Sequence, residues 1–279
     1  MRKLIADEES TLYLYLRKNM KDKSKNNIKT LLAKGIILVN DNVVTNYDYL
    51  LQKNDVITFK KTKSNSLILN IIYEDDDIIV VNKPYGILTI ANKKEKEHTL
   101  YREVSKYLKK ENKKVFIIHR LDKDTSGIIM FAKNQKIQKL YQNNWNDLAK
   151  IREYSAVVEG VTDVKGHIES YLKQTKTLKV YSSKNKDGYF AITNYERVKN
   201  NNKFSLLKIH ILTGRRNQIR CHMSDIGHPI VGDKRYHAKS NPINRLALHA
   251  NKLVIINPLT KEIMTFSCPI PKEFDKLIN

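Results

Sequence analysis

The stretch Ile118-His119-Arg120-Leu121-Asp122-Lys123-Asp124-Thr125-Ser126-Gly127-Ile128 lies between two apolar runs of this 279-residue sequence, 115–118 and 128–132. Such runs are typical of strands, and polar loops at strand ends are where proteins commonly place reactive groups. Lys123, Arg120 and a further basic group would each favour the ionised form of Asp122, preparing it as a nucleophile or a base. The same residue types also suit a simple turn, in which Asp122 or Asp124 accepts backbone N–H bonds and Gly127 reverses the chain.

The chain from residue 67 onward is rich in predicted strands. Apolar runs predict them at 67–73, 78–81, 115–118, 128–132, 154–158, 190–195, 204–212, 253–256 and 264–266. Helical patterns follow Thr99 and Asn134, and a third runs from about Arg216 to Ile226. Because strands outnumber helices without regular alternation, we expect an α+β domain with a mixed, largely antiparallel β-sheet flanked by helices.

The first 65 residues predict a separate helix-helix-hairpin module. Helices are expected after Ser10 or Thr11 and after Ser24, with Gly35 as a C-terminal stop. Strands at 36–39 and 43–44 flank a turn at 40–42, and 55–59 adds a third strand. The polar run Lys60–Ser66 indicates a linker. We therefore expect two domains, residues 1–65 and residues 66–279.

Charge is the strongest compositional signal. The sequence holds 51 Lys and Arg against 29 Asp and Glu, a formal net charge of +22, which indicates a polyanionic partner such as nucleic acid. A lysine-rich solvated surface is the alternative for charge alone. The basic side chains expected to follow a phosphate backbone from the N-terminal helices are Arg17, Lys18, Lys25 and Lys29.

Several classes of protein and site are not supported. The sequence has no apolar run long enough to cross a bilayer and no apolar signal core, which favours a cytoplasmic protein without a membrane partner. Cys221 and Cys268 are too far apart for a zinc knuckle, so neither a metal site nor a disulfide is expected. Glycine-rich G-x-G-x-x-G and G-x-x-x-x-G-K-[ST] motifs are absent, so we expect no nucleotide cofactor.

The string His119-Arg-Leu-Asp122-x-x-Thr125-Ser126-Gly127 resembles the signature of the RluA-like, large-subunit-type pseudouridine synthases. One further match, at 80–89, precedes this string, and four follow it in order at 152–160, 213–222, 227–233 and 248–250. Together the matches span almost all of residues 70–270. The N-terminal module resembles an S4 RNA-binding domain through its helix at 24–32, Gly35 and the hairpin that follows.

The resemblance implies an enzyme that isomerises uridine in RNA to pseudouridine and needs neither a metal nor a cofactor. Asp122 matches the catalytic position, although Asp124 is a rival by chemistry alone. Tyr154 matches the active-site tyrosine, and Arg220 matches the arginine that pairs with the catalytic aspartate, a bidentate task. His119 and Arg120 are implied to shape the loop and to meet RNA. The implied substrate is 23S ribosomal RNA, with transfer RNA as the alternative, and the default oligomeric state is a monomer.

Two details and three rival functions complete the expectations. Arg216-Asn217 stands where the resembling family commonly has Thr-His, a change that could alter substrate contacts, and Lys83 is expected to be structural and solvated. A non-catalytic RNA binder, an S4-linked RNA methyltransferase and a DNA-binding protein are the rivals. The methyltransferase would need a glycine-rich turn after its first strand, and the sequence has none.

Overall fold

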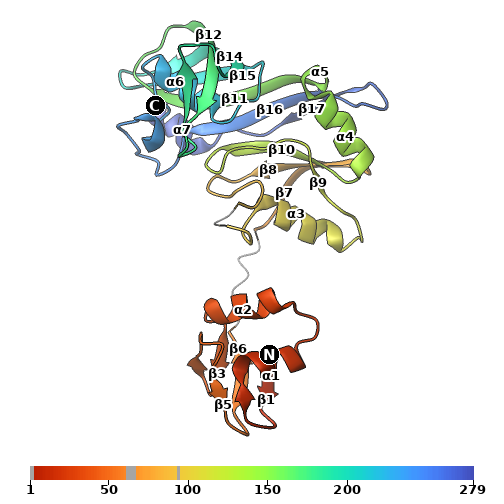
Figure 1. The fold of residues 1–279 in the computed structure, drawn as a ribbon. Coiled ribbons are helices and arrows are strands. Elements are labelled where there is room, and N and C mark those ends of the chain that lie inside the picture. The colour runs from red at the N-terminus through yellow and green to blue at the C-terminus, as the bar shows by residue number, and fades with distance from the viewer. Residues whose placement is uncertain (1–2, 61–66, 93–94) are drawn as a thin grey trace. The chain divides into compact units, whose positions relative to one another are not determined.

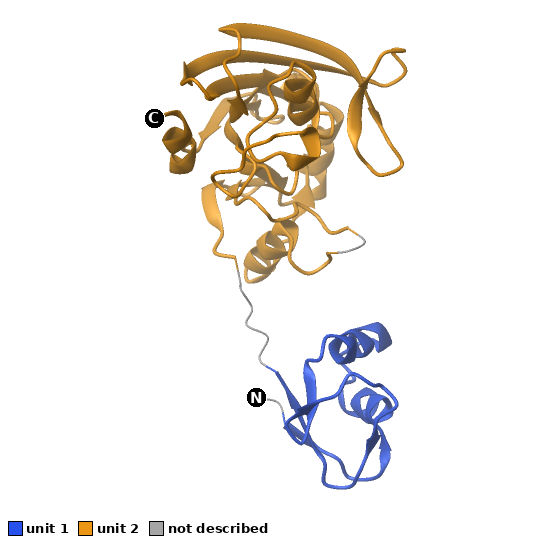
Figure 2. Ribbon diagram, turned by 90° about the vertical axis from the view of Figure 1, so that its left-hand side faces the viewer, with its two compact units in different colours: residues 1–66 blue, residues 67–279 orange. Residues whose placement is uncertain are grey.

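The computed structural model describes residues 3–60, 67–92 and 95–279, which belong to two compact units, Met1–Ser66 and Leu67–Asn279 (Figure 2). The linker expected at Lys60–Ser66 falls, from residue 61 onward, outside the described residues. Among the described helices, none has the length and apolar character needed to cross a bilayer.

The first unit packs two helices against a small sheet (Figure 1). Thr11 and Ser24 cap the helices, because their hydroxyls accept from Leu14 N at 3.4 Å and Asn27 N at 3.2 Å. The hairpin turn at Asn40 has positive φ, as a two-residue hairpin requires. The elements are β1 (Lys3–Ile5), β2 (Ser10–Thr11), α1 (Leu12–Asn19), α2 (Lys25–Ala33), β3 (Ile37–Val39), β4 (Asn42–Val43), β5 (Leu50–Leu51) and β6 (Val56–Phe59), with sheet order β1-β6-β3-β4 and a separate β2-β5 pair.

The second unit is built on a mixed sheet of eleven strands. Its path runs β13-β12-β14-β15-β11-β16-β10-β8-β7, with β17 paired to β16 and β9 to β10. The strands are β7 (Asn70–Glu74), β8 (Ile78–Lys83), β9 (Phe116–Ile117), β10 (Ser126–Ala132), β11 (Ala149–Glu159), β12 (Lys165–Gln174), β13 (Val180–Ser183), β14 (Tyr189–Asn200), β15 (Phe204–Ile211), β16 (Leu248–Ile256) and β17 (Ile263–Ser267).

Helices cover both faces of this sheet, so the expected α+β domain with a mixed sheet is confirmed. Along β8, Ile78 and Val80 pack in the core on the α4 face, whereas Ile79 and Val81 pack on the α3 face. This alternation explains why β8 and β10 are apolar on both faces. The helices are α3 (Leu100–Lys109), α4 (Gln135–Asn143), α5 (Trp145–Leu148), α6 (Gln218–Asp225), the 3₁₀ turn η1 (Lys234–Tyr236) and α7 (Lys272–Ile278).

One junction joins the two halves of the sheet. β10 runs parallel to β16, with Ser126 opposite His249 and Gly127 opposite Ala250, whereas the other paired strands of the described residues are antiparallel. Gly127 has φ +114°, and a Cβ on it would lie 2.2 Å from the Ala250 carbonyl oxygen. A glycine is therefore required for β16 to approach β10 at this point.

Replacing Gly127 by alanine tests this close approach. We expect Gly127→Ala to lower the free energy of unfolding by about 2–5 kcal/mol, the sum of backbone strain and overpacking. Gly227→Ala is the matched control, because Gly227 has φ +83° but no atom within 4 Å of a Cβ, so only the strain of about 1–2 kcal/mol applies. Urea unfolding of the full chain measures both, and equal losses would contradict the interpretation.

His222 ties α6 to the sheet and makes stability depend on pH. Its ring is fully buried between Ser170 Oγ and Thr193 Oγ1, each 2.9 Å from a ring nitrogen, and burial lowers its pKa to about 4. The unfolded chain protonates this histidine near pH 6.5. Because the unfolded state then binds more protons between pH 6.5 and about 4, stability falls as the pH drops through that window.

We expect His222→Gln to remove this contribution while keeping a polar side chain between the two hydroxyls. Urea unfolding of both proteins at several pH values should give a slope that is shallower in the variant, by at most about 1.4 kcal/mol per pH unit. The other buried histidines act equally on both proteins, so the difference isolates His222. Parallel slopes for the two proteins would refute the assignment.

Candidate active site

The loop that leads into β10 is anchored at its first half by two side chains. His119 Nε2 accepts from Met130 N at 3.1 Å, and its ring stacks on Trp145 with centroids 4.7 Å apart. Thr89 Oγ1 donates to Leu121 O at 2.8 Å and accepts from Leu121 N at 3.2 Å. Burial lowers the pKa of His119 to about 3, so the ring is neutral. His119 shapes the loop through these contacts, and an RNA contact by it stays a prediction.

The second half of the loop is anchored by Ser126. Its hydroxyl lies 2.8 Å from His249 Nδ1 on β16 and accepts from Arg245 Nη2 at 2.5 Å. All three side chains are buried. Asp122 therefore lies between two fixed points, which restricts the positions that its carboxylate can take.

Lys83 closes the loop from β8, and the expectation of a solvated side chain is wrong. The residue is 0% exposed, and its Nζ donates to Pro84 O at 3.0 Å, Ile87 O at 2.9 Å and Lys123 O at 2.9 Å. Burial lowers its pKa to about 7, against the opposing charges of Asp124 and Asp122. Three carbonyl acceptors match the three donors of an ammonium group, so they replace the water that a surface lysine would have.

Arg220 projects from α6 toward Asp122, but its short contacts are elsewhere. Its Nη1 lies 3.9 Å from Asp122 Oδ2. Its Nε and Nη2 donate to the two oxygens of Asp233 at 2.7 and 2.8 Å. The pairing with Asp122 implied by the resemblance is thus present as a long ion pair, whereas the expected bidentate geometry is wrong. Asp233 is 2% exposed, and a carboxylate buried this deeply needs two charge-assisted bonds.

A group that the sequence analysis did not place in the site lies closer to Asp122. With its nitrogen turned toward the carboxylate, the Asn217 amide donates from Nδ2 to Asp122 Oδ2 at 2.7 Å and lies 3.3 Å from Oδ1. We assign this orientation because the opposite one would set the amide oxygen against the carboxylate. Asn217 is itself 7% exposed and faces the carboxylate, and the altered substrate contact considered for this position stays a prediction. Asn217 precedes α6 by one residue, and no periodic pattern marks its partner.

Desolvation and surrounding cations act on Asp122 in opposite directions. The Asp122 side chain is 28% exposed to solvent. Burial raises its pKa, while Arg220, Arg216, Lys83 and Arg120 lower it, and the net direction is upward. Arg120 and the other cations thus favour the ionised form as the sequence analysis expected, but burial, which that analysis did not weigh, outweighs them. Direct hydrogen-bond donors act in the same direction as the cations and favour the ionised form.

Tyr154 lies on β11 beside the strand junction. The pairing of β11 with β16 shifts register between Glu153 and Tyr154, and such bulges re-aim side chains next to active sites. The ring is partly buried between the cores of both halves of the sheet. Burial raises the pKa of Tyr154 to about 12, with Arg152 opposing and Asp122 adding to the shift. The structure thus brings together Asp122, Tyr154 and Arg220, and the phenol is protonated at neutral pH.

The N-terminal basic residues belong to the first unit and differ in their partners. Lys18 pairs with Asp7 at 3.5 Å and Glu8 at 2.9 Å, which partly neutralises it. Lys29 Nζ lies 5.7 Å from the ring centroids of both Tyr13 and Tyr47. The two remaining predicted phosphate contacts are Arg17 on α1 and Lys25 on α2, the latter exposed.

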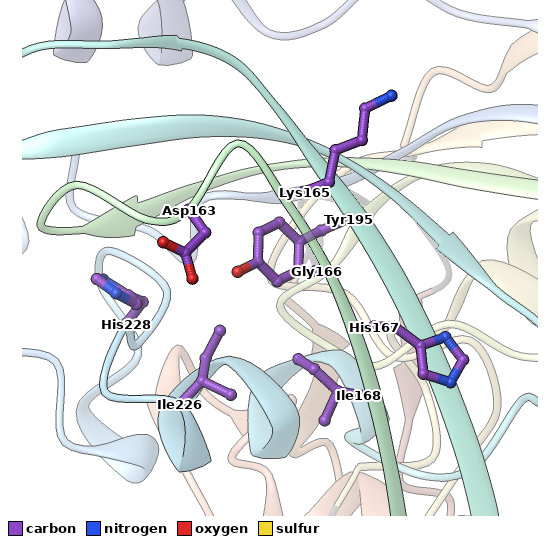
Figure 3. A pocket seen from close by; sticks show the side chains of 8 residues that line it. All are labelled: Asp163, Lys165, Gly166, His167, Ile168, Tyr195, Ile226 and His228. Carbon is purple, nitrogen blue, oxygen red and sulfur yellow. The ribbon is translucent and has the colours of Figure 1, made fainter.

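A cavity of about 250 Å³ lies on β12 and β14 near the end of α6, and none of the predicted site residues lines it (Figure 3). Its lining comprises Asp163, Lys165, Gly166, His167, Ile168, Tyr195, Ile226 and His228. Among the residues that the structure describes, no cluster of three or more His, Cys, Asp or Glu could hold a metal ion.

Comparison with known proteins identifies the family. Residues 77–225 match the model for the family described as RNA pseudouridylate synthase. A Bacillus subtilis protein named "Uncharacterized RNA pseudouridine synthase YhcT" is 31% identical, over 98% of this chain and 95% of its own length. The Vibrio cholerae protein named "Ribosomal large subunit pseudouridine synthase D" is 30% identical, over 90% of this chain and 85% of its own.

A solved structure supports the fold. The structure titled "Human RNA Pseudouridylate Synthase Domain Containing 1" superimposes with a TM-score of 0.62 at 22% identity, covering 74% of this chain and 85% of its own. The family match lies in the second unit, and it includes Asp122, Tyr154 and Arg220. The chain belongs to the RNA pseudouridylate synthase family and is an RNA pseudouridine synthase.

Proposed function

We propose that this enzyme isomerises uridine in 23S ribosomal RNA and that Asp122 is its catalytic carboxylate. One observation carries the assignment of Asp122: both Asn217 and Arg220 face its carboxylate. Its chemical rival, Asp124, lies two residues further along the chain. The choice of ribosomal RNA is supported by relatives named "Ribosomal large subunit pseudouridine synthase D". Transfer RNA is the alternative substrate, and a monomeric, cytoplasmic enzyme stays a prediction.

The reaction requires an ionised carboxylate beside the target sugar. The N1–C1′ bond breaks, C5 joins C1′, C5 loses its proton and N1 gains one, so no atom is added overall. A carboxylate can attack C1′, attack the base or accept a sugar proton, and each route needs Asp122 unprotonated. Tyr154 offers a ring on which an extruded uracil can stack and a hydroxyl beside the proton that leaves C5.

The N-terminal unit would supply affinity for RNA. Its order of two capped helices followed by a hairpin supports an S4-type RNA-binding domain. Arg17, Lys25 and Lys29 are the side chains that we propose to bind phosphates there. In the catalytic unit, the exposed Arg120 would meet the RNA next to Asp122 and help to displace the target nucleotide.

Asp122→Asn tests the catalytic assignment, with Asp124→Asn as the matched control. Carbodiimide mapping of unmodified 23S and transfer RNA transcripts should show new stops with the wild type and with Asp124→Asn. We expect Asp122→Asn to be at least about 10³-fold slower, because the amide can neither attack carbon nor accept a proton. Loss of activity in Asp124→Asn alone would overturn the assignment, and stops in transfer RNA alone would overturn the proposed substrate.

Binding to the RNA should depend on salt through the N-terminal cations. We expect the slope of log affinity against log salt to fall in magnitude by about 0.7–0.9 for each of Arg17→Ala, Lys25→Ala and Lys29→Ala. Lys18→Ala is the control and should change the slope less, because Asp7 and Glu8 already pair with Lys18. Filter binding of transcripts at several salt concentrations measures this. A slope that none of the three replacements changes would contradict the proposed interface.

A further inference from the structure

The direct hydrogen-bond donor to Asp122 is an amide, whereas the neighbouring guanidinium is engaged elsewhere. Arg220 gives its two short hydrogen bonds to Asp233, at 2.7 and 2.8 Å, and approaches Asp122 only to 3.9 Å. Asn217 Nδ2 lies 2.7 Å from Asp122 Oδ2. The Arg220–Asp233 pair therefore supplies a field around Asp122, while Asn217 supplies the contact that can aim the carboxylate.

The Asn217 amide has a buried partner on its other side, and the Asp122 carboxylate decides which way the amide is turned. Its Oδ1 accepts from the Tyr236 hydroxyl at 3.2 Å, and that hydroxyl accepts from Val180 N at 3.2 Å. The opposite orientation would set the amide oxygen against the Asp122 carboxylate. Asn217, Tyr236 and Val180 are 7%, 2% and 4% exposed, so water does not compete for these groups.

The backbone at Asn217 is also unusual for its position. Asn217 precedes α6 as its N-cap, with φ 50° and ψ 21°, yet its side chain makes no capping hydrogen bond. An asparagine at a helix start ordinarily uses its side chain to cap the first turn. Here the left-handed backbone turns the amide toward Asp122 instead, and such conformations persist where surrounding contacts hold them.

The contacts form one chain of donors that ends on the carboxylate. The Val180 N–H donates to the Tyr236 hydroxyl. The single proton of that hydroxyl has two acceptors, Asn217 Oδ1 at 3.2 Å and Val180 O at 3.1 Å, and the Asn217 amide donates to Asp122. Hydrogen bonds arranged head to tail polarise one another, and a donor at the end of such a chain favours the ionised form of its acceptor. The chain therefore acts against the burial of Asp122.

We propose that Asn217 is the positioning residue for Asp122 and that Tyr236 holds the far end of the Asn217 amide. The proposal rests on the proposed function, in which Asp122 is the catalytic carboxylate. Asn217 itself touches no reacting atom, so its effect is exerted through the aim and the ionisation of Asp122.

Other charged or titratable groups also face Asp122, and neutral replacements at positions 217 and 236 do not alter their charges. They come from four places in the fold: Arg216 and Arg220 at α6, Lys83 from β8, Arg120 from the same loop and Tyr154 from β11. A change in the titration of Asp122 after such a replacement is therefore assigned to the lost hydrogen bond.

The test compares Asn217→Gly, which suits a positive φ, with Asn244→Gly, an exposed asparagine at φ 54°. Steady-state kcat and KM are measured from about pH 5 to about pH 9. We expect Asn217→Gly to lower kcat about 10–100-fold at neutral pH with little change in KM, and to move the acidic limb of the profile upward by about one pH unit. Asn244→Gly should match the wild type.

Asn217→Asp and Tyr236→Phe sharpen the test. An aspartate at position 217 would place two carboxylates 2.7 Å apart, so they would share a proton and move the acidic limb upward by more than one pH unit. Tyr236→Phe keeps both Asn217 and the ring that lies 5.1 Å from the Arg220 guanidinium, and should shift the limb less. If Asn217→Gly fails to fold, Tyr236→Phe carries the test.

A measurement without RNA separates this proposal from the proposed function. Carboxyl carbon NMR of the full chain, with the Asp122 signal identified by its absence in Asp122→Asn, gives the titration of Asp122 directly. We expect it to titrate at higher pH in Asn217→Gly and Tyr236→Phe. An unchanged titration, with a rate reduced equally at every pH, would overturn the positioning role. If the wild-type protein were inactive on every RNA, the proposed function would be refuted. The titration of Asp122 would still decide whether Asn217 positions and ionises it.

Discussion

The close approach of Gly127 to Ala250 is the constraint on which the site depends. Ala250 of β16 pairs with Gly127 of β10 on one side and with Tyr154 of β11 on the other. Gly127, Ala250 and Tyr154 thus lie in one row across three neighbouring strands, β10, β16 and β11. The end of the loop that holds Asp122 is therefore two strands away from Tyr154. A side chain at position 127 would push β16 from β10, because its Cβ would overlap the Ala250 backbone. The geometry of the site therefore depends on the absence of a side chain at Gly127 as much as on the polar groups of the site.

Around this junction, the protein holds a part-buried carboxylate by fixing the groups next to it. The loop is held at three points. Lys83 and Thr89 bind its backbone, and Ser126 at its end binds His249, so the loop cannot move away from the cations. Burial favours the neutral acid, and the cations favour the carboxylate. Fixed neighbours keep the carboxylate in one environment, which suits the catalytic role that we propose for Asp122.

Much of the architecture could be predicted from local pattern. Thr99 and Asn134 cap α3 and α4 as expected, and Gly227 follows the end of α6. Strands β12 and β13 were not predicted, because the only adjacent apolar residues of β12 are Tyr171 and Leu172 and polar residues or glycine fill most of its other positions. The partners in the site could not be read from spacing. The partners are brought together only by the folded sheet. They are Arg220 with Asp233, Lys83 with Lys123 O, and Asn217 with Asp122.

The two donors that face Asp122 differ in a way that explains why both are present. The charge of Arg220 is largely compensated by Asp233, which is closer to the guanidinium than Asp122 is, so its net attraction for Asp122 is reduced. An amide carries no charge and has no counter-ion to compensate it, and its hydrogen bond is directional. Asn217 can therefore fix the orientation of the carboxylate without binding it as tightly as a free guanidinium would. A carboxylate held only by a fork of two charged bonds, as Asp233 is, would be too stable to attack or to accept a proton, and Asp233 takes that fork in place of Asp122.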